Sequence, residues 1–178
     1  MNIDPVVLIV LGLTLSYVVV DAGLHKLRNP LHYAAVIDDY RVLPQGSGSY
    51  AVWVAGAVEI GAGVAILLPP FNGAGLAVAG LLLLAYFAAI GLNLQRGRRA
   101  IDCGCGAPGR AQGLSAGLLV RNAVLALAAL VSSAAQPLAR DVAWFDWLVA
   151  IAAALTVILI YLSASLLLAN NHLLVRLK

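Results

Sequence analysis

Five long apolar segments constrain the fold of this chain more than any other feature. They are residues 5–24, 50–68, 73–94, 114–135 and 145–169. A helix that crosses the hydrocarbon core of a bilayer needs about 20 mostly apolar residues. Strands of a membrane barrel would instead show alternating units of about ten residues. Because the five runs are continuous and long, the sequence predicts an all-α, polytopic membrane helix bundle with five transmembrane helices, a four-helix core plus one.

The composition supports a lipid environment. The chain is 62% hydrophobic and only 11% charged, whereas soluble domains average about 45–50% apolar and about 25% charged residues. Much of the surface must therefore face lipid, and we expect a single integral membrane domain over residues 1–178. The sequence has no nucleotide-binding glycine loop and no nucleic-acid signature, and its net charge of +3 needs no nucleic-acid partner.

The basic residues predict an orientation in the membrane. Five spans place the two chain ends on opposite faces, of which face A holds the N-terminus and the residues around Arg140, its one basic residue. Face B receives nine basic residues, namely Lys26, Arg28, Arg41, Arg96, Arg98, Arg99, Arg110, Arg176 and Lys178. Basic residues in short loops stay on the cytoplasmic side. We therefore expect an inner-membrane protein with a periplasmic N-terminus and a cytoplasmic face B. The first segment lacks a basic leader and a clear cleavage site, so we expect it to be retained.

A short helix is predicted between the first two spans. Asn29 is a favourable N-cap and Pro30 suits the first helical position. Apolar side chains recur on one side at Leu31, Ala34, Ile37 and Tyr40. This spacing favours an amphipathic helix in the headgroup region that ends at Pro44, although a loop with a chance pattern remains the alternative.

Several polar side chains fall inside the apolar spans, where a charge costs about 2.5–3.5 kcal/mol at the helix centre. Asp21 and His25 are one helical turn apart near face B, Glu59 is in the middle of the second span, and Arg121 and Asn122 are in the fourth. At about 1.5 Å per residue, Glu59 lies roughly 13 Å and Arg121 roughly 10 Å below face B. We expect these two to pair, with Asn122 adding a hydrogen bond. One interpretation is a structural ion pair; the other is a polar pocket below face B with Asp21 and His25 at its mouth.

The chain has two cysteines, Cys103 and Cys105, in the sequence D-C-G-C-G. Two thiols separated by one glycine can close a small, strained ring, which suits a labile disulfide. The nearby basic residues that would favour the reactive thiolate are Arg96, Arg98, Arg99 and Arg110. Asp102 acts against this effect, but it could carry protons. Thiol–disulfide exchange, with both cysteines as the reacting groups, is the first interpretation.

Two other interpretations of the cysteine pair stay open. Two thiolates are too few for a closed zinc site, so His25, His32 or a second subunit would have to complete it. A two-coordinate Cu(I) ion needs fewer ligands and suits thiolates, but one Met and three His give no metal path of the kind expected of a transporter. The third interpretation is that the thiols are incidental. A quinone could accept or supply electrons, although no residue pattern marks a pocket for it.

Four stretches, with their order and spacing, carry a resemblance to a family. They are A-G-L-H-K-L-R-N-P at 22–30, D-Y-R-V-L-P at 39–44, V-E-I-G-A-G at 58–63, and D-C-G-C-G at 102–106 followed by V-R-N at 120–122. The sequence resembles the MauE group of bacterial membrane proteins, within the wider MauE/DoxX set of redox-associated membrane proteins. The last span and the tail add little to the resemblance.

The resemblance implies a role in the maturation of methylamine dehydrogenase. That enzyme is periplasmic, and its small subunit carries many disulfides and a tryptophan-derived quinone cofactor. The MauE group works beside a thioredoxin-like protein, MauD, which has a Cys-x-x-Cys site. Cys103 and Cys105 would then exchange electrons with such a partner. Relatives could serve other periplasmic disulfide pathways, or act as assembly scaffolds without chemistry.

The implied partner and the charge pattern point to different sides of the membrane. A periplasmic partner would most simply meet periplasmic thiols, whereas the arginines place Cys103 and Cys105 on the cytoplasmic side. Either the bundle relays reducing equivalents across the membrane or the loop faces outwards. We expect the orientation that the charge pattern predicts.

Overall fold

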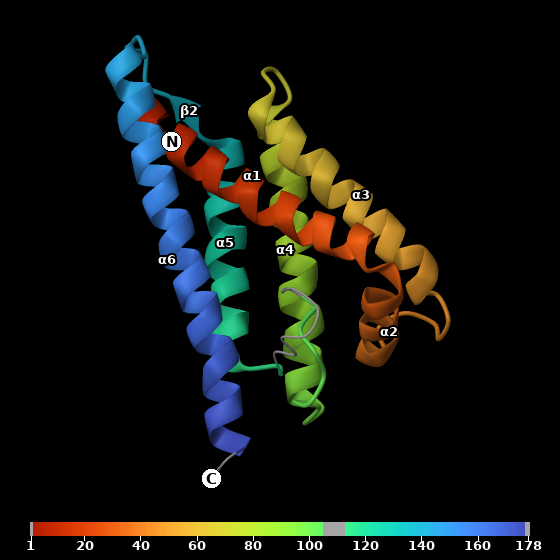
Figure 1. Ribbon diagram of the computed structural model, residues 1–178. Helices are drawn as coiled ribbons and strands as arrows, with labels where there is room; N and C mark the ends of the chain where they lie inside the picture. The colour runs from red at the N-terminus through yellow and green to blue at the C-terminus, as the bar shows by residue number, and fades with distance from the viewer. Residues whose placement is uncertain (1, 105–112, 177–178) are drawn as a thin grey trace.

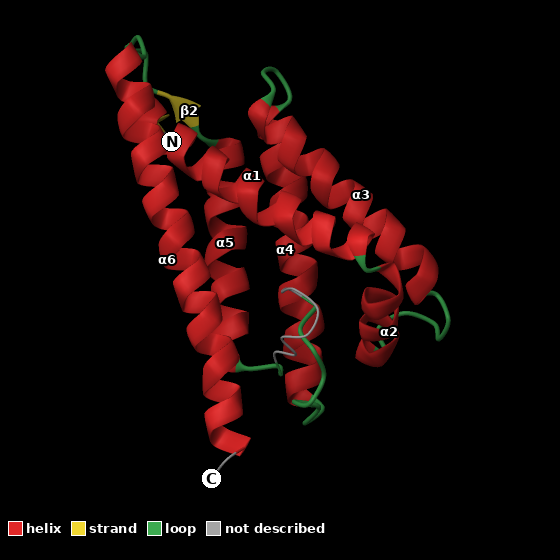
Figure 2. Ribbon diagram, in the orientation of Figure 1, coloured by secondary structure: helices red, strands yellow, loops and turns green. Residues whose placement is uncertain are grey.

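The computed structural model describes residues 2–104 and 113–176, with side chains described as far as Ala169. This part of the chain is almost entirely helical (Figures 1 and 2). The helices are α1 (Pro5–Arg28), α2 (Pro30–Tyr40), α3 (Gly48–Leu67), α4 (Asn72–Gln95), α5 (Ala116–Ala134) and α6 (Trp144–Arg176). Two short strands, β1 (Asn2–Ile3) and β2 (Gln136–Pro137), pair in parallel. Cys105 and Arg110 lie outside the described residues.

The five predicted spans are confirmed. Among the described residues, five helices are long and apolar enough to cross a bilayer: α1, α3, α4, α5 and the Trp144–Ala169 part of α6. Figure 1 shows the N-terminus, the α3–α4 turn and β2 at one end of the bundle, face A. The C-terminal end of α6, α2 and the segment between α4 and α5 lie toward the other end, face B. The chain is therefore a multi-pass membrane protein.

The central contacts are made by α1, α3, α4 and α5. Leu15, Ile66, Leu76 and Ala126 belong to one buried cluster with small side chains around them. α1 and α3 approach closely at Gly63, where an added Cβ would clash with Val20 Cγ2. Close backbone approach between helices is the means of association that lipid favours. In α6 only 6% of the membrane window is buried, so α6 is the helix outside the four-helix core.

The helix α2 is confirmed, but the predicted face of the helix is partly wrong. Leu31 is 89% exposed, whereas the buried residues of α2 are Tyr33, Ala34, Val36 and Tyr40. These positions follow helical spacing and pack against α3 and the segment around Cys103, so contacts with protein rather than with headgroups select the buried side. The helix ends at Tyr40, before the left-handed Arg41 (φ 49°), and not at Pro44. Asn29 is at the N-cap without a side-chain capping bond.

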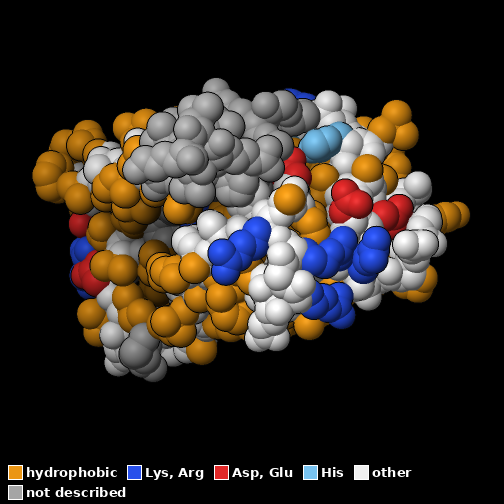
Figure 3. All heavy atoms as spheres, turned by 90° about the horizontal axis from the view of Figure 1, so that it is seen from below, with side chains coloured by type: hydrophobic (Ala, Val, Ile, Leu, Met, Phe, Trp, Pro, Cys, Tyr) orange, Lys and Arg blue, Asp and Glu red, His pale blue; other side chains and the backbone are white. Residues whose placement is uncertain are grey.

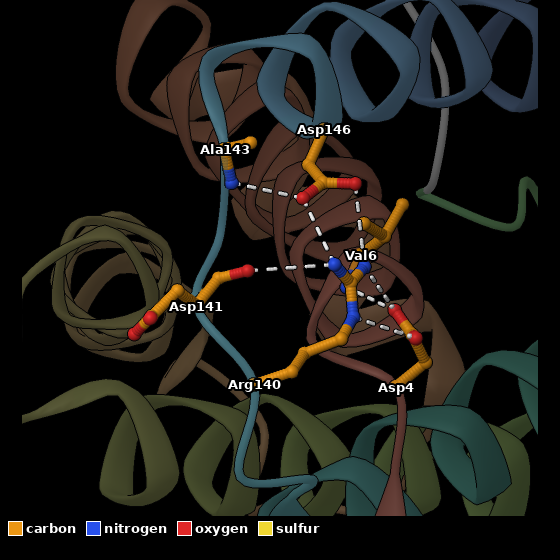
Figure 4. A network of polar contacts seen from close by, with 6 residues as sticks. All are labelled: Asp4, Val6, Arg140, Asp141, Ala143 and Asp146. Atoms are coloured by element: carbon orange, nitrogen blue, oxygen red, sulfur yellow. Dashed lines mark hydrogen bonds and ion pairs between the residues drawn. The ribbon is translucent and has the colours of Figure 1, made fainter.

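Face A is fixed by a polar network (Figure 4). Arg140 bridges Asp4 and Asp146, with its Nε 3.0 Å from Asp4 Oδ2 and its Nη1 2.9 Å from Asp146 Oδ2. Asp4 also accepts the backbone N–H of Val6 at 2.8 Å and so caps α1. Hydrogen bonds from Arg140, and then the one from Val6, lower the pKa of Asp4. The pair β1–β2 joins the same two segments, since Leu138 N donates to Ile3 O at 2.9 Å.

Face B carries a cluster of basic side chains. The view of this end in Figure 3 shows Lys and Arg side chains gathered on it. Arg28, Arg41, Arg96 and Arg99 are exposed there. The excess of basic residues that the sequence predicts for face B is therefore found at that end of the bundle.

Candidate functional site

Cys103 lies in the segment that joins α4 to α5. The two ends of this segment are held together by the hydrogen bond from Leu114 N to Arg99 O (3.0 Å) and by an antiparallel bridge between Asp102 and Gly113. Cys103 is only 6% exposed. Its buried neighbours are Val36, Tyr40, Ile90, Leu114 and Leu118. The thiol is therefore enclosed by α2, α4 and α5, and not displayed on the surface.

A chain of hydrogen bonds holds the backbone at Cys103. Tyr40 Oη donates to the carbonyl oxygen of Cys103 at 3.1 Å. Asn93 Nδ2 in turn donates to the carbonyl oxygen of Tyr40 at 3.1 Å, and Arg98 Nη1 donates to Asn93 Oδ1 at 3.1 Å. Gly104 follows with φ +68°, and an added Cβ there would be 3.2 Å from Val36 Cγ1. Glycine adopts this left-handed conformation at little cost, and its missing side chain leaves room for Val36 of α2.

A cavity of about 300 Å³ lies below Cys103, towards the middle of the bundle. Cys103 and Gly104 form part of its wall, and all six helices contribute residues. Most of the lining is aliphatic. The aromatic part consists of Tyr33, Tyr40, Tyr86 and Tyr161. The charged part consists of Lys26, Glu59 and Arg121.

The main polar feature of the cavity is a buried ion pair. Lys26 Nζ lies 2.8 Å from Glu59 Oε1 and 3.0 Å from Glu59 Oε2, and the residues are 6% and 1% exposed. Tyr86 Oη donates to Glu59 Oε1 at 2.5 Å, and its ring centroid lies 5.1 Å from Lys26 Nζ. Burial of two charges is tolerated because each compensates the other and Tyr86 adds a hydrogen bond.

The sequence predicted a Glu59–Arg121 pair, and the structure differs. Glu59 takes Lys26 as its ionic partner. Arg121 Nη1 instead donates to Ser165 Oγ at 3.3 Å, and its guanidinium lies 5.6 Å from the centre of the Tyr161 ring. Glu59, Arg121 and Asn122 nevertheless line the same cavity. Asn122 itself donates to the carbonyl oxygen of Leu118 in its own helix (3.1 Å).

The direction of side chains on a helix explains this difference. Each Cα–Cβ bond is tilted toward the N-terminus of its helix. In α1 the N-terminus is at face A, so Lys26 is directed into the membrane; in α3 it is at face B, so Glu59 is directed towards Lys26. In the sequence, Lys26 is recognisable only as one of the loop cations of face B. The length of its side chain and this tilt are the signals that could have identified it.

The other predicted polar residues lie near the cavity but do not line it. Asp21 and His25 pair with each other at 3.5 Å and are partly exposed. Asp102 is paired with His32 at 3.5 Å, and its Oδ1 also accepts Gly104 N at 3.3 Å. Asp102 and His32 therefore place a carboxylate and an imidazole directly beside the cysteine segment. Within the described residues, no three His, Cys, Asp or Glu side chains meet in a group that could hold a metal ion.

Comparison with known proteins identifies the family. The family model described as methylamine utilisation protein MauE matches residues 4–135. The chain belongs to the MauE family. It is 36% identical over 165 residues to the methylamine utilization protein MauE of Paracoccus denitrificans, which covers 93% of this chain and 89% of that protein. It is 37% identical over 165 residues to the MauE of Methylorubrum extorquens, covering 92% and 88% of the two chains.

A further relative, the MauE of Paracoccus versutus, is 31% identical over 146 residues, which is 82% of this chain and 78% of that protein. No solved structure matches the chain. The family model covers α1 to α5 and both cysteines, whereas α6, which contributes Tyr161 to the cavity, lies beyond the matched residues. The resemblance to the MauE family that the short sequence stretches indicated is therefore confirmed.

Proposed function

We propose that this MauE-family protein is a membrane thiol–disulfide component. Cys103 and Cys105 would exchange electrons with a thioredoxin-like protein and so support disulfide formation in a periplasmic enzyme such as methylamine dehydrogenase. The observation that carries the proposal is the place of Cys103. One thiol of a Cys-Gly-Cys pair is fixed by Tyr40 in the wall of a buried cavity that holds an ion pair.

Because Cys103 is buried, the two sulfurs should have different roles in the exchange. A protein partner cannot reach a thiol that is 6% exposed and enclosed by Val36 and Leu118. We therefore assign the exchange with the partner to Cys105, the other cysteine of the pair. Cys103 would be the inner thiol that closes and reopens the disulfide with Cys105.

The exchange balances as follows in the direction that oxidises the partner. A partner thiolate attacks the Cys105 sulfur of the Cys103–Cys105 disulfide, and Cys103 leaves as a thiolate that takes up a proton. The partner's second thiolate then attacks the sulfur of the partner's first cysteine in the mixed disulfide, and Cys105 leaves as a thiolate that takes up a proton. The partner loses two electrons and two protons, and the Cys103–Cys105 pair gains both. Asp102 and His32, 3.5 Å apart beside the cysteine segment, are suited to supply and accept the protons.

Trapping of the mixed disulfide tests this proposal. Cys103→Ser leaves Cys105 as the only thiol. A thioredoxin-like partner that lacks its second cysteine, with its remaining thiol activated as a mixed disulfide with thionitrobenzoate, should become attached to Cys105, because the Cys105 thiolate displaces thionitrobenzoate. Cys105→Ser leaves the buried Cys103, and capture should be weak or undetectable. The measurement is a non-reducing gel with mass spectrometry of the cross-linked peptide. The Cys103→Ser/Cys105→Ser double variant is the control for attachment that does not depend on thiols.

Two results would contradict the proposal. The first is the absence of a mixed disulfide from both single variants. The second is full maturation of the periplasmic enzyme in cells that carry the double variant, which would favour an assembly scaffold. Copper or zinc that is bound stoichiometrically and lost with either cysteine would support the metal carrier instead.

A further inference from the structure

We propose that the cavity below Cys103 is a binding site for the head group of a membrane quinone, which accepts the electron pair from the Cys103–Cys105 dithiol. This inference rests on the proposed thiol–disulfide function and names its electron acceptor. Three features of the described residues support it: the chemistry of the cavity wall, an apolar groove that borders the cavity between α5 and α6, and the position of Cys103.

The cavity has the size and lining of a small-molecule site. Its volume of about 300 Å³ is at the lower end of the range for ligand pockets, which are mostly apolar with a few placed polar groups. The aliphatic part of the wall includes Val18, Leu83 and Ile90. Tyr33 and Tyr86 add aromatic rings to the wall. A flat, apolar ring with polar oxygens at its edge matches such a lining.

Lys26 offers a hydrogen-bond donor to such a ring. An ammonium group has three N–H donors, and among the residues that the structure describes, the two oxygens that accept from Lys26 both belong to Glu59. At least one donor is therefore available to a ligand in the cavity. A quinone carbonyl oxygen accepts hydrogen bonds and becomes more negative as it is reduced, so a buried cation beside it favours reduction. Glu59 balances that cation when the cavity holds no ligand.

On the side of α5 and α6, the cavity is bordered by a second pocket. A second, apolar pocket of about 490 Å³ lies between these helices and shares Arg121, Leu125 and Tyr161 with the cavity. The rest of its wall is mainly aliphatic and includes Val124 and Leu168. Because α6 faces lipid over most of its length, this groove is a lateral path into the bundle. A prenyl tail would lie in the groove while the ring occupies the cavity.

The position of Cys103 makes the electron transfer direct. Cys103 is part of the wall of the same cavity, so a quinone ring in the cavity lies against the cysteine segment. The dithiol loses two electrons and two protons as the bond between the two sulfurs forms, and the quinone gains both and becomes a quinol. A phospholipid acyl chain would also fit the groove, but it has no group that needs the buried Lys26–Glu59 pair.

A pair of matched variants tests the site. Leu125→Trp places a large ring where the groove meets the cavity. Leu127→Trp, two residues further along α5, makes the same change at a side chain that is 65% exposed to lipid. The full-length protein is reconstituted in nanodiscs with reduced thioredoxin-like partner and a soluble short-tail ubiquinone analogue. Quinone reduction is followed by absorbance, and mixed-disulfide formation is followed separately in the Cys103→Ser background.

We expect the wild-type protein to reduce the quinone in step with partner oxidation. Leu125→Trp should slow quinone reduction about tenfold or more, because an overfilled site loses affinity, while Leu127→Trp stays close to wild type. Both variants should still form the mixed disulfide. If the Cys103→Ser protein forms the mixed disulfide but the wild-type protein reduces no quinone, this inference alone is overturned. Equal effects of the two tryptophan substitutions, or a bound lipid that quinone fails to displace, would also overturn it. If the Cys103→Ser protein forms no mixed disulfide, the proposed function is overturned as well.

Discussion

Lys26 and Glu59 are the two residues on which the interior of the bundle depends most. Both are buried, both line the cavity, and each is the charged partner of the other. A buried ion pair adds little net stability compared with apolar residues, but a single buried charge without its partner is costly. The pair therefore acts as a unit, and its two members should be tested together.

Removal of one member should destabilise the protein far more than removal of both. Glu59→Gln keeps the size of the side chain but leaves the Lys26 ammonium without its counter-charge, which should cost about 3 kcal/mol. Lys26→Met combined with Glu59→Gln should recover most of that loss. The measurement is thermal unfolding of the purified variants in detergent. If the single and double variants unfold alike, the two side chains do not form the pair described here.

The elements show which parts of the fold a sequence can specify. The spans were predictable because bilayer thickness sets a minimum length for an apolar helix. The start of α2 was predictable from Asn29 and Pro30. The buried face of α2 was not, since Tyr33 and Val36 are buried by contact with α3 and the cysteine segment, a tertiary effect without a local signal.

The candidate site was predictable in part for the same reason. The thiols and the intramembrane polar residues stand out in the sequence because they are rare in an apolar chain. Their partners depend on how the helices are rotated, so depth alone placed Glu59 opposite Arg121. The tilt of the side chains on the antiparallel helices α1 and α3 instead places Glu59 beside Lys26. The support of Cys103 by Tyr40 and Asn93 has no sequence signature.

The contact between the N-terminal segment and the α5–α6 connection should depend on pH. The pKa of Asp4 is lowered by Arg140 and by the N–H of Val6. Asp4 therefore contributes stability that is complete above the pKa of the unfolded chain, near 3.8. This contribution is lost as the pH falls through the lower pKa of the folded state. We expect the N-terminal end of α1 to become more accessible to an acid-active protease in that range.

Asp4→Asn is the control for this pH dependence. The asparagine cannot change its charge, so the difference in cleavage between neutral and acidic conditions should shrink for this variant. Equal acid sensitivity of Asp4→Asn and the wild type would show that another group is responsible.

At the scale of the whole molecule, the distribution of basic residues predicts the side on which the thiols lie. The exposed basic side chains of Arg28, Arg41, Arg96 and Arg99 lie at face B, and Arg140 lies at face A, so face B should be cytoplasmic. A membrane-impermeant thiol reagent should therefore fail to label Cys103 or Cys105 in intact cells and should label the loop after the inner membrane is permeabilised.

The labelling experiment needs a site on the other face as its control. Asp141→Cys, in a chain that also carries Cys103→Ser and Cys105→Ser, places a thiol at an exposed position of face A. This thiol should react in intact cells. Strong labelling of the native cysteines in intact cells would reverse the orientation and place the thiols beside a periplasmic partner.

The redox state of the cysteine pair is the most direct test of the central claim. The purified full-length protein is equilibrated in a series of thiol–disulfide buffers, its free thiols are alkylated, and the products are counted by mass spectrometry. If Cys103 and Cys105 form a reversible disulfide, both sulfurs should change together from alkylated to protected across one transition. A pair that keeps one oxidation state in every buffer would contradict the account.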